Sequence, residues 1–349
     1  MSDVRSILPF LLRYPDILTE GEKQTVRDGY ALLGRQSVDS ALKKEKQSRP
    51  FAAEVLSLCG CDEEYWNQVH EEYVKRNTAI VEILKAVFKT FHEKGGKTLN
   101  VYENFGAVLS SGLTVGNFAS GDVDFTVEED EVPIAIDAIH ANGFFEEERS
   151  DHAKASDLIV MPFYNPNALE GKGYWLNIMR KPIARSYMLK QDRYLTRLSE
   201  LRKEGLDQYK ETEIRLLKPT AMVYFNALHF ACEHFYSASP GMALCCDMDR
   251  VIRTREIDWD RLARWSKEDN AGLRIRLALD VCHYFLKTEV PLEKFGEPSK
   301  TYRKLWDRIV DEEHNYLISQ DGKLNRLKTE LLSDDMPLLK SLICRLWSK

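Results

Sequence analysis

The sequence predicts an α+β fold in which a small mixed sheet lies between two helical regions. Before residue 96 and after residue 191, apolar residues recur three and four positions apart, as they do in amphipathic helices. Between these regions the pattern changes to short β-compatible segments separated by turn-rich loops. No repeat, low-complexity tract or long linker divides the sequence. We therefore expect regions 1–96, 97–190 and 191–349 to pack as one body.

Composition and charge narrow the class of protein. The net charge of -6 over 349 residues provides no general attraction to nucleic acid or to an anionic membrane. Apolar stretches fall short of the ~20 residues that a membrane-spanning helix needs, and the N-terminus has no signal-peptide pattern. The seven cysteines lack zinc-ligand spacing, so most are predicted to be reduced and buried. We expect a globular cytoplasmic protein without a nucleic-acid or membrane partner.

The helical regions have recognisable ends. The clearest N-terminal helix is predicted over 69–94, and Gly95-Gly96 would end it. The charged segment 41–50 is either a solvent-exposed helix face or a loop that ends at Pro50. Further helices are predicted in the C-terminal region, punctuated by prolines, over 220–236, 258–287, 300–318 and 336–347.

The middle region contains the strands. The segment "TLNVYENFGAVLSSG" (98–112) begins with β-compatible residues and is expected to run into a small-residue turn. A helix is predicted over 131–143, closed by Asn142-Gly143. Short strands are predicted at 122–127, 157–165 and 174–182. The region therefore predicts a compact mixed sheet with a helix packed on it.

An acidic pair, Asp122-Val-Asp124, begins the strand "DVDFTV". Because side chains alternate along a strand, both carboxylates face the same side, with Cα atoms roughly 6.5–7 Å apart. Two carboxylates at this separation can reach the same hard cations, and Mg²⁺ is commonly held by one or two carboxylates together with phosphate oxygens. In isolation such a pair is more often a solvated strand end. A cation between the carboxylates would relieve their repulsion.

The segment before the pair is rich in small residues. Ser110 and Ser111 offer hydroxyl and backbone donors, while Gly112, Gly116 and Gly121 allow a close backbone approach. A triphosphate needs such a cradle. Together the loop and the pair predict a metal–nucleotide site, in which Asp122 and Asp124 hold the metal.

These motifs resemble those of the nucleotidyltransferase superfamily with a polymerase-β-like palm. Ser111-Gly112, nine residues and Asp122-Val-Asp124 match its signature, although the small pair has the order Ser-Gly instead of Gly-Ser. The sequence is also similar to the uncharacterised nucleotidyltransferase family, in which two histidines lie on one C-terminal helix, here within 227–262. The resemblance implies a palm at 97–190 and Mg²⁺-dependent, pyrophosphate-releasing transfer from an NTP, with ATP expected, to a small-molecule or peptide acceptor.

The resemblance also exposes a departure from the pattern. The superfamily usually has a third carboxylate on a later strand, and "YWLNIMRK" places Asn177 at that position. An amide cannot act as a base. Asp151 or Asp157 could substitute for the missing acid. Either the acceptor is already ionised, or the site binds a nucleotide without efficient turnover, as a binding or interaction module.

Other polar residues are candidates for supporting roles. Basic side chains after the last strand are candidates for contacting phosphate, or else a solvated face: Arg180, Lys181, Arg185, Lys190 and Arg193. His229 and His234 are five apart, so they are expected to be a hydrogen-bonded or pocket-lining pair and not a metal site. A second acidic pair, Asp247-Met-Asp249, is expected on a partly exposed helix face. Asp258 is expected to be an N-cap.

Overall fold

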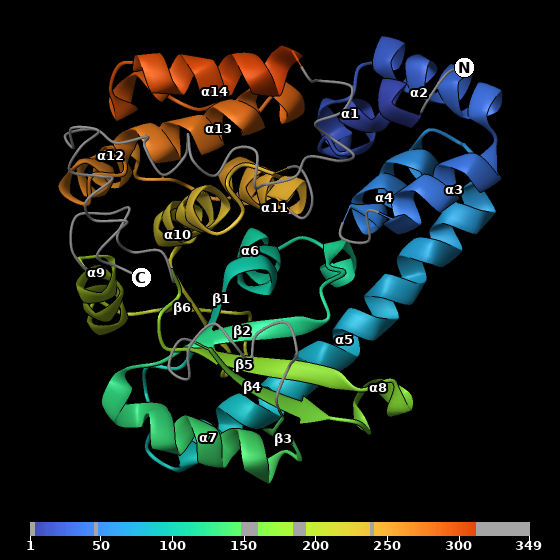
Figure 1. Cartoon of the computed structure of the whole chain (residues 1–349). Helices are drawn as coiled ribbons and strands as arrows, with labels where there is room; N and C mark the ends of the chain where they lie inside the picture. The colour runs from blue at the N-terminus through green and yellow to red at the C-terminus, as the bar shows by residue number, and fades with distance from the viewer. Residues whose placement is uncertain (1–3, 45–47, 148–159, 184–192, 238–240, 312–349) are drawn as a thin grey trace.

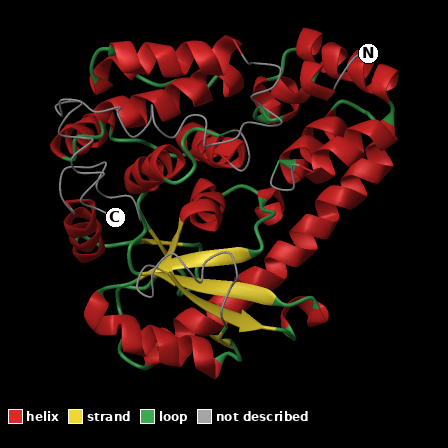
Figure 2. Cartoon of the chain, viewed as in Figure 1, coloured by secondary structure: helices red, strands yellow, loops and turns green. Residues whose placement is uncertain are grey.

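The computed structural model describes residues 4–44, 48–147, 160–183, 193–237 and 241–311. A mixed sheet lies at one end of the molecule, and the C-terminal helices stack beyond one of its faces (Figures 1 and 2). The predicted α+β class is confirmed. Within the described part of the chain, every helix is too short or too polar to cross a membrane.

The sheet has the strand order β3-β4-β5-β2-β1-β7-β6. Strand β2 is parallel to β5, and β1 is parallel to β7, while the other neighbours are antiparallel. The strands are β1 (Asn100–Tyr102), β2 (Asp122–Thr126), β3 (Phe145–Glu146), β4 (Val160–Asn165), β5 (Tyr174–Met179), β6 (Asp207–Gln208) and β7 (Arg215–Leu216). The three strands predicted in the middle region are confirmed as β2, β4 and β5.

The N-terminal helices end in a long helix that packs under the sheet. They are α1 (Leu8–Leu11), α2 (Glu20–Leu33), α3 (Arg35–Lys44), α4 (Arg49–Leu58) and α5 (Glu63–Glu93). The helix predicted over 69–94 is confirmed by α5, which ends before Gly95 at a φ of +90°. Residues 41–44 belong to α3, and Pro50 lies in the first turn of α4, where its missing N–H costs nothing.

The segment 98–112 differs from the expected strand and small-residue turn. Only Asn100–Tyr102 is a strand, and a helix, α6 (Glu103–Ser111), follows it directly. Glu103 makes the change of direction with a positive φ of 56°. The turn prediction was wrong because Phe105, Val108 and Leu109 recur at helical spacing and bury one side of α6 in the core.

Two of the three predicted regions contribute strands to the sheet, and the N-terminal region packs against it. Strands β6 and β7 come from beyond residue 190, and α5 from the N-terminal region packs against the sheet. Phe88 of α5 meets Phe125 of β2 edge to face, with ring centroids 5.9 Å apart. The predicted helix over 131–143 is α7 (Val132–Ala141), which packs with α5 below the sheet (Figure 1). The boundaries near residues 96 and 190 stay predictions, and elements from both sides of each pack together.

The C-terminal helices form a layer above α6, except α9, which lies lower at the left (Figure 1). They are α9 (Arg193–Lys203), α10 (Pro219–Cys232), α11 (Gly241–Thr254), α12 (Trp259–Glu268), α13 (Gly272–Leu286) and α14 (Lys300–Asp311). Asp258 accepts a hydrogen bond from the backbone N–H of Arg261 at 2.9 Å, so the N-cap prediction is confirmed. The six cysteines in the described residues are free and buried, as predicted. The helix predicted over 336–347 lies outside the described residues.

Candidate active site

Three side chains from adjacent strands meet on one face of the sheet. The parallel register of β2 and β5 sets Asp124 opposite Asn177. The Asn177 side-chain amide donates hydrogen bonds to Asp124 Oδ1 at 2.8 Å and to Asp122 Oδ2 at 3.2 Å. Asn177 is buried, and it therefore holds both carboxylates in place. The expected alignment of this strand is confirmed, whereas Asp151 and Asp157 lie outside the described residues.

Around the acidic pair, acidic side chains outnumber basic ones. Burial raises the pKa of Asp124 well above its usual value, and the neighbouring Asp122 and Glu103 carboxylates raise it further. The hydrogen bond from Asn177 and the nearby His229 oppose this rise. Ser120 also donates to Asp122 Oδ1, at 2.6 Å. The folded chain thus holds acidic groups together at an electrostatic cost that a bound cation would relieve.

Glu103 is a site residue that sequence reasoning missed. It follows Tyr102, which is paired with Asp124, and its carboxylate is almost fully buried. Its Oε1 lies 3.0 Å from Nδ1 of His229 on α10. Nothing in the spacing of the acids predicted this contact. The only available signal was a carboxylate at the end of the strand that precedes the acidic pair.

The two histidines form the predicted hydrogen-bonded pair, although His234 lies just beyond the end of α10. Nε2 of His229 and Nε2 of His234 lie 2.9 Å apart and share a hydrogen bond. Burial lowers the pKa of His229, but the Glu103, Glu233 and Asp124 carboxylates outweigh burial and raise the pKa overall. A chain of contacts therefore runs from Glu103 through His229 to His234, beside the acidic pair.

The donor set fits a hard cation. Carboxylate and amide oxygens are the ligands that Mg²⁺ prefers, and Mg²⁺ sites use few protein ligands beside substrate phosphates and water. Asn177 turns its amide nitrogen toward both carboxylates, so its unpartnered Oδ1 points away from the place that a cation between them would take. Among the described residues, no group of three or more His, Cys, Asp or Glu side chains is arranged to hold a metal. Asp122 and Asp124 are therefore the ligands that this cluster offers, and Asn177 holds them in place through its N–H groups.

The small residues before the pair lie at the end of a helix, and their contact with phosphate stays a prediction. Ser110 and Ser111 end α6, about 12 Å along the helix from Glu103 at 1.5 Å per residue. The Ser111 hydroxyl donates to the Val108 carbonyl at 2.8 Å and so belongs to the helix end. Gly112 has a φ of +71° that closes the helix. The predicted small-residue turn was therefore wrong, because these residues form the end of a helix.

Gly116 has a packing reason of its own. A Cβ atom there would lie 2.6 Å from His70 and 2.8 Å from Val74, both on α5. Asn77, also on α5, donates to the carbonyls of Val115 and Phe118 and fixes the same loop. The glycine therefore permits close packing of the loop on α5, and its predicted contact with phosphate stays a prediction.

Two of the predicted basic residues contact different partners in the structure. Arg180 follows β5 and forms an ion pair with Glu129. Lys181 is adjacent in sequence, while Arg193 begins α9 and donates to the Glu268 carbonyl. Arg185 and Lys190 lie outside the described residues. Their contact with phosphate stays a prediction.

Residues 62–287 match the model of a family described as uncharacterised nucleotidyltransferase. The chain belongs to this family. The matched span contains the acidic pair, Asn177, Glu103 and His229. No curated protein and no solved structure matches the chain. The family resemblance predicted from the sequence is confirmed.

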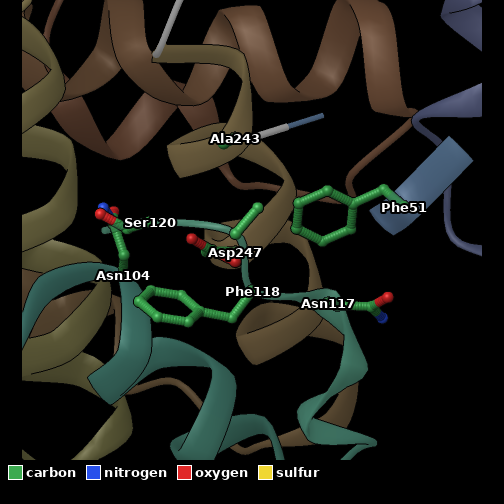
Figure 3. Close-up of a pocket in the computed structure, with 8 residues that line it drawn as sticks. Phe51, Asn104, Asn117, Phe118, Ser120, Ala243 and Asp247 are labelled. Atoms are coloured by element: carbon green, nitrogen blue, oxygen red, sulfur yellow. The ribbon is translucent and has the colours of Figure 1, made fainter. Parts of the chain in front are cut away.

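The second acidic pair of this nucleotidyltransferase family member is buried, so the expected partly exposed helix face was wrong. Asp249 accepts hydrogen bonds from Arg253 at 2.8 Å and from Thr288 at 2.6 Å. Asp247 lines a small cavity between α11 and the loop before β2 (Figure 3). Burial raises the pKa of Asp247 well above its usual value, and Arg250 opposes the rise. The helix packs against α6, α10 and α13, and both carboxylates are buried among these helices.

Proposed function

We propose that the protein transfers a nucleotidyl group from an NTP, with ATP as the expected nucleotide, to a small-molecule or peptide acceptor, releasing pyrophosphate with Mg²⁺ bound. The convergence of Asp122, Asp124 and Asn177 on one sheet face supports this, in a chain of nucleotidyltransferase family. Because β2 and β5, the strands that carry these residues, are neighbours in a mixed sheet, we also propose that the sheet is a polymerase-β-like palm. Nucleotide binding then requires the acidic pair.

Each residue has a role that follows from its chemistry. Asp122 and Asp124 would hold Mg²⁺, which when bound supplies positive charge to the phosphate oxygens. Asn177 orients both carboxylates through its two hydrogen bonds. Because its amide accepts no proton, this position provides no general base. We therefore propose that the acceptor nucleophile is already an anion, such as a phosphate oxygen.

A second candidate is a nucleotide-binding or protein-interaction module without turnover. The observation that favours it is that Asn177 directs its side-chain N–H groups toward both carboxylates, at the position where a third acid is expected. Such a protein would bind a metal-bound triphosphate and release no pyrophosphate.

The test measures pyrophosphate release from each labelled NTP with Mg²⁺ and a panel of phosphorylated and hydroxyl acceptors. The wild type should release pyrophosphate, and Asp122→Asn and Asp124→Asn should each abolish the release and the binding of MgATP seen by calorimetry. Asp130→Asn, at an exposed position, is the matched control and should change neither. Binding of MgATP without pyrophosphate release would favour the binding module. Unchanged binding in both acidic variants would contradict the metal site.

A further inference from the structure

Two aromatic side chains stand on the same face of the sheet as the acidic pair. Trp175 in β5 is directly opposite Asp122 in β2, and Tyr164 in β4 is directly opposite Trp175. Directly opposed residues share a sheet face, so these rings and the carboxylates face the same side. The other face carries Val123, Phe163 and Leu176, which are buried in the core.

The two rings stack on each other, and we call this pair the aromatic shelf. Their centroids lie 4.6 Å apart, and their planes are tilted by 34°. Each residue is half-buried, so part of each ring stays accessible. Gly173 helps to position Tyr164, because a Cβ atom at Gly173 would collide with the Tyr164 hydroxyl. The shelf is therefore held by the backbone beneath it, next to the acids.

The spacing of the shelf suits a nucleotide. Trp175 lies one strand away from Asp122, about 4.8 Å between Cα atoms, and Tyr164 lies two strands away, about 9.6 Å. In an NTP, a ribose separates the base from the phosphates. A triphosphate bound at the acidic pair would thus bring its base over the next strands of the sheet. An aromatic side chain can stack on any of the nucleobases, since every base has a π-face.

We propose that the nucleobase of the NTP whose phosphates bind at Asp122 and Asp124 stacks on an outer ring face of the aromatic shelf formed by Tyr164 and Trp175. The inference rests on the proposed function and adds the part of the substrate that the acids do not contact. The shelf binds the base by its flat face, whereas the acidic pair binds only the metal-bound phosphates. The two halves of the substrate therefore depend on different residues.

The test compares two ligands that differ in the base. Calorimetry on the full chain measures the affinity for MgATP and for magnesium tripolyphosphate, which has no base or ribose. Trp175→Ala should weaken MgATP binding by about 5- to 150-fold, the range for loss of one base–aromatic stack, and should leave tripolyphosphate binding unchanged. Trp175→Phe should restore most of the affinity, and Tyr164→Ala should act in the same direction as Trp175→Ala.

The matched control is Trp259→Ala, which removes another half-buried tryptophan that packs against an aromatic ring, Phe295. It should change neither affinity. The shelf is wrong if Trp175→Ala, with an unchanged melting temperature, binds MgATP as the wild type does, or if it weakens both ligands equally. A wild type that binds tripolyphosphate as tightly as MgATP would overturn only the shelf. A wild type that binds neither ligand would overturn the proposed function as well.

Discussion

Strand β2 and helix α11 carry the same spacing of acids, and the two pairs have different surroundings. On the strand, Asp122 and Asp124 face one side and share the amide of Asn177. On the helix, two positions apart correspond to about 200° of rotation, so Asp247 and Asp249 point in different directions. Asp249 pairs with Arg253, and Asp247 lines a cavity. The spacing alone therefore predicts a shared site only when the segment is a strand.

The largest expected effect comes from completing the strand pair with a third acid. Asn177→Asp adds a possible base beside Asp124, and general-base help is worth roughly 10²–10⁴-fold. We expect transfer to hydroxyl acceptors to rise by up to that range, measured as pyrophosphate release with hydroxyl and phosphorylated acceptors. The same variant should be less stable without Mg²⁺, because two hydrogen bonds become carboxylate repulsion.

Asn167→Asp is the control for this variant, since it makes the same change of charge at an exposed position. It should leave both acceptor rates unchanged. If Asn177→Asp also leaves both rates unchanged, the position has no influence on the acceptor, and the proposed role of the amide is wrong.

The helix pair should matter for stability and not for nucleotide binding. Asp249→Ala removes the acceptor for Thr288, which is fully buried, and one partner of the ion pair with Arg253. Leaving these donors unmatched should cost about 2–3 kcal/mol of unfolding free energy. Urea denaturation measures the loss. Asp249→Asn keeps an acceptor oxygen and should lose less, and equal losses in the two variants would argue against the hydrogen bonds as the cause.

The smallest expected change in unfolding free energy comes from substitution of Asp247, and this change should depend on pH. Burial raises the pKa of Asp247 in the folded state above its unfolded value, so the folded state binds the extra proton more tightly. The unfolding free energy contributed by this group is therefore fully present below the unfolded pKa, near pH 4, and falls as the pH rises toward the folded pKa. Asp247→Asn imitates the neutral acid. It should match the wild type near pH 4 and be more stable at pH 7.

Denaturation curves at the two pH values measure this difference, which we expect to be smaller than the loss in Asp249→Ala. A variant that is less stable than the wild type at pH 7 would show that Asp247 is charged and well partnered in the folded chain. Binding of MgATP should be the same in Asp247→Asn and in the wild type. This would separate the helix pair from the strand pair.

The sequence predicted the parts that depend on local pattern. Alternation along "DVDFTV" placed Asp122 and Asp124 on one face, and the pattern of the later strand brought Asn177 beside them. The segment 103–111 was misjudged, because its small and apolar residues are compatible with both a turn and a short buried helix. Packing of the apolar residues of this segment against the core favours the helix. The burial of Asp247 could not be predicted either, since α11 has neighbours from distant parts of the chain.

The sequence by itself determined the fold class, the family, the acidic strand and the main helix ends, since these depend on residue type and on spacing within one segment. The tertiary structure decided which distant residues join the acids. Glu103 and His229 are 126 positions apart in the chain, yet their side chains touch beside Asp124. Tyr164, Trp175 and Asp122 line up only through the pairing of β4, β5 and β2. Strand register and helix packing are properties of several segments at once, so no single segment of the sequence encodes them.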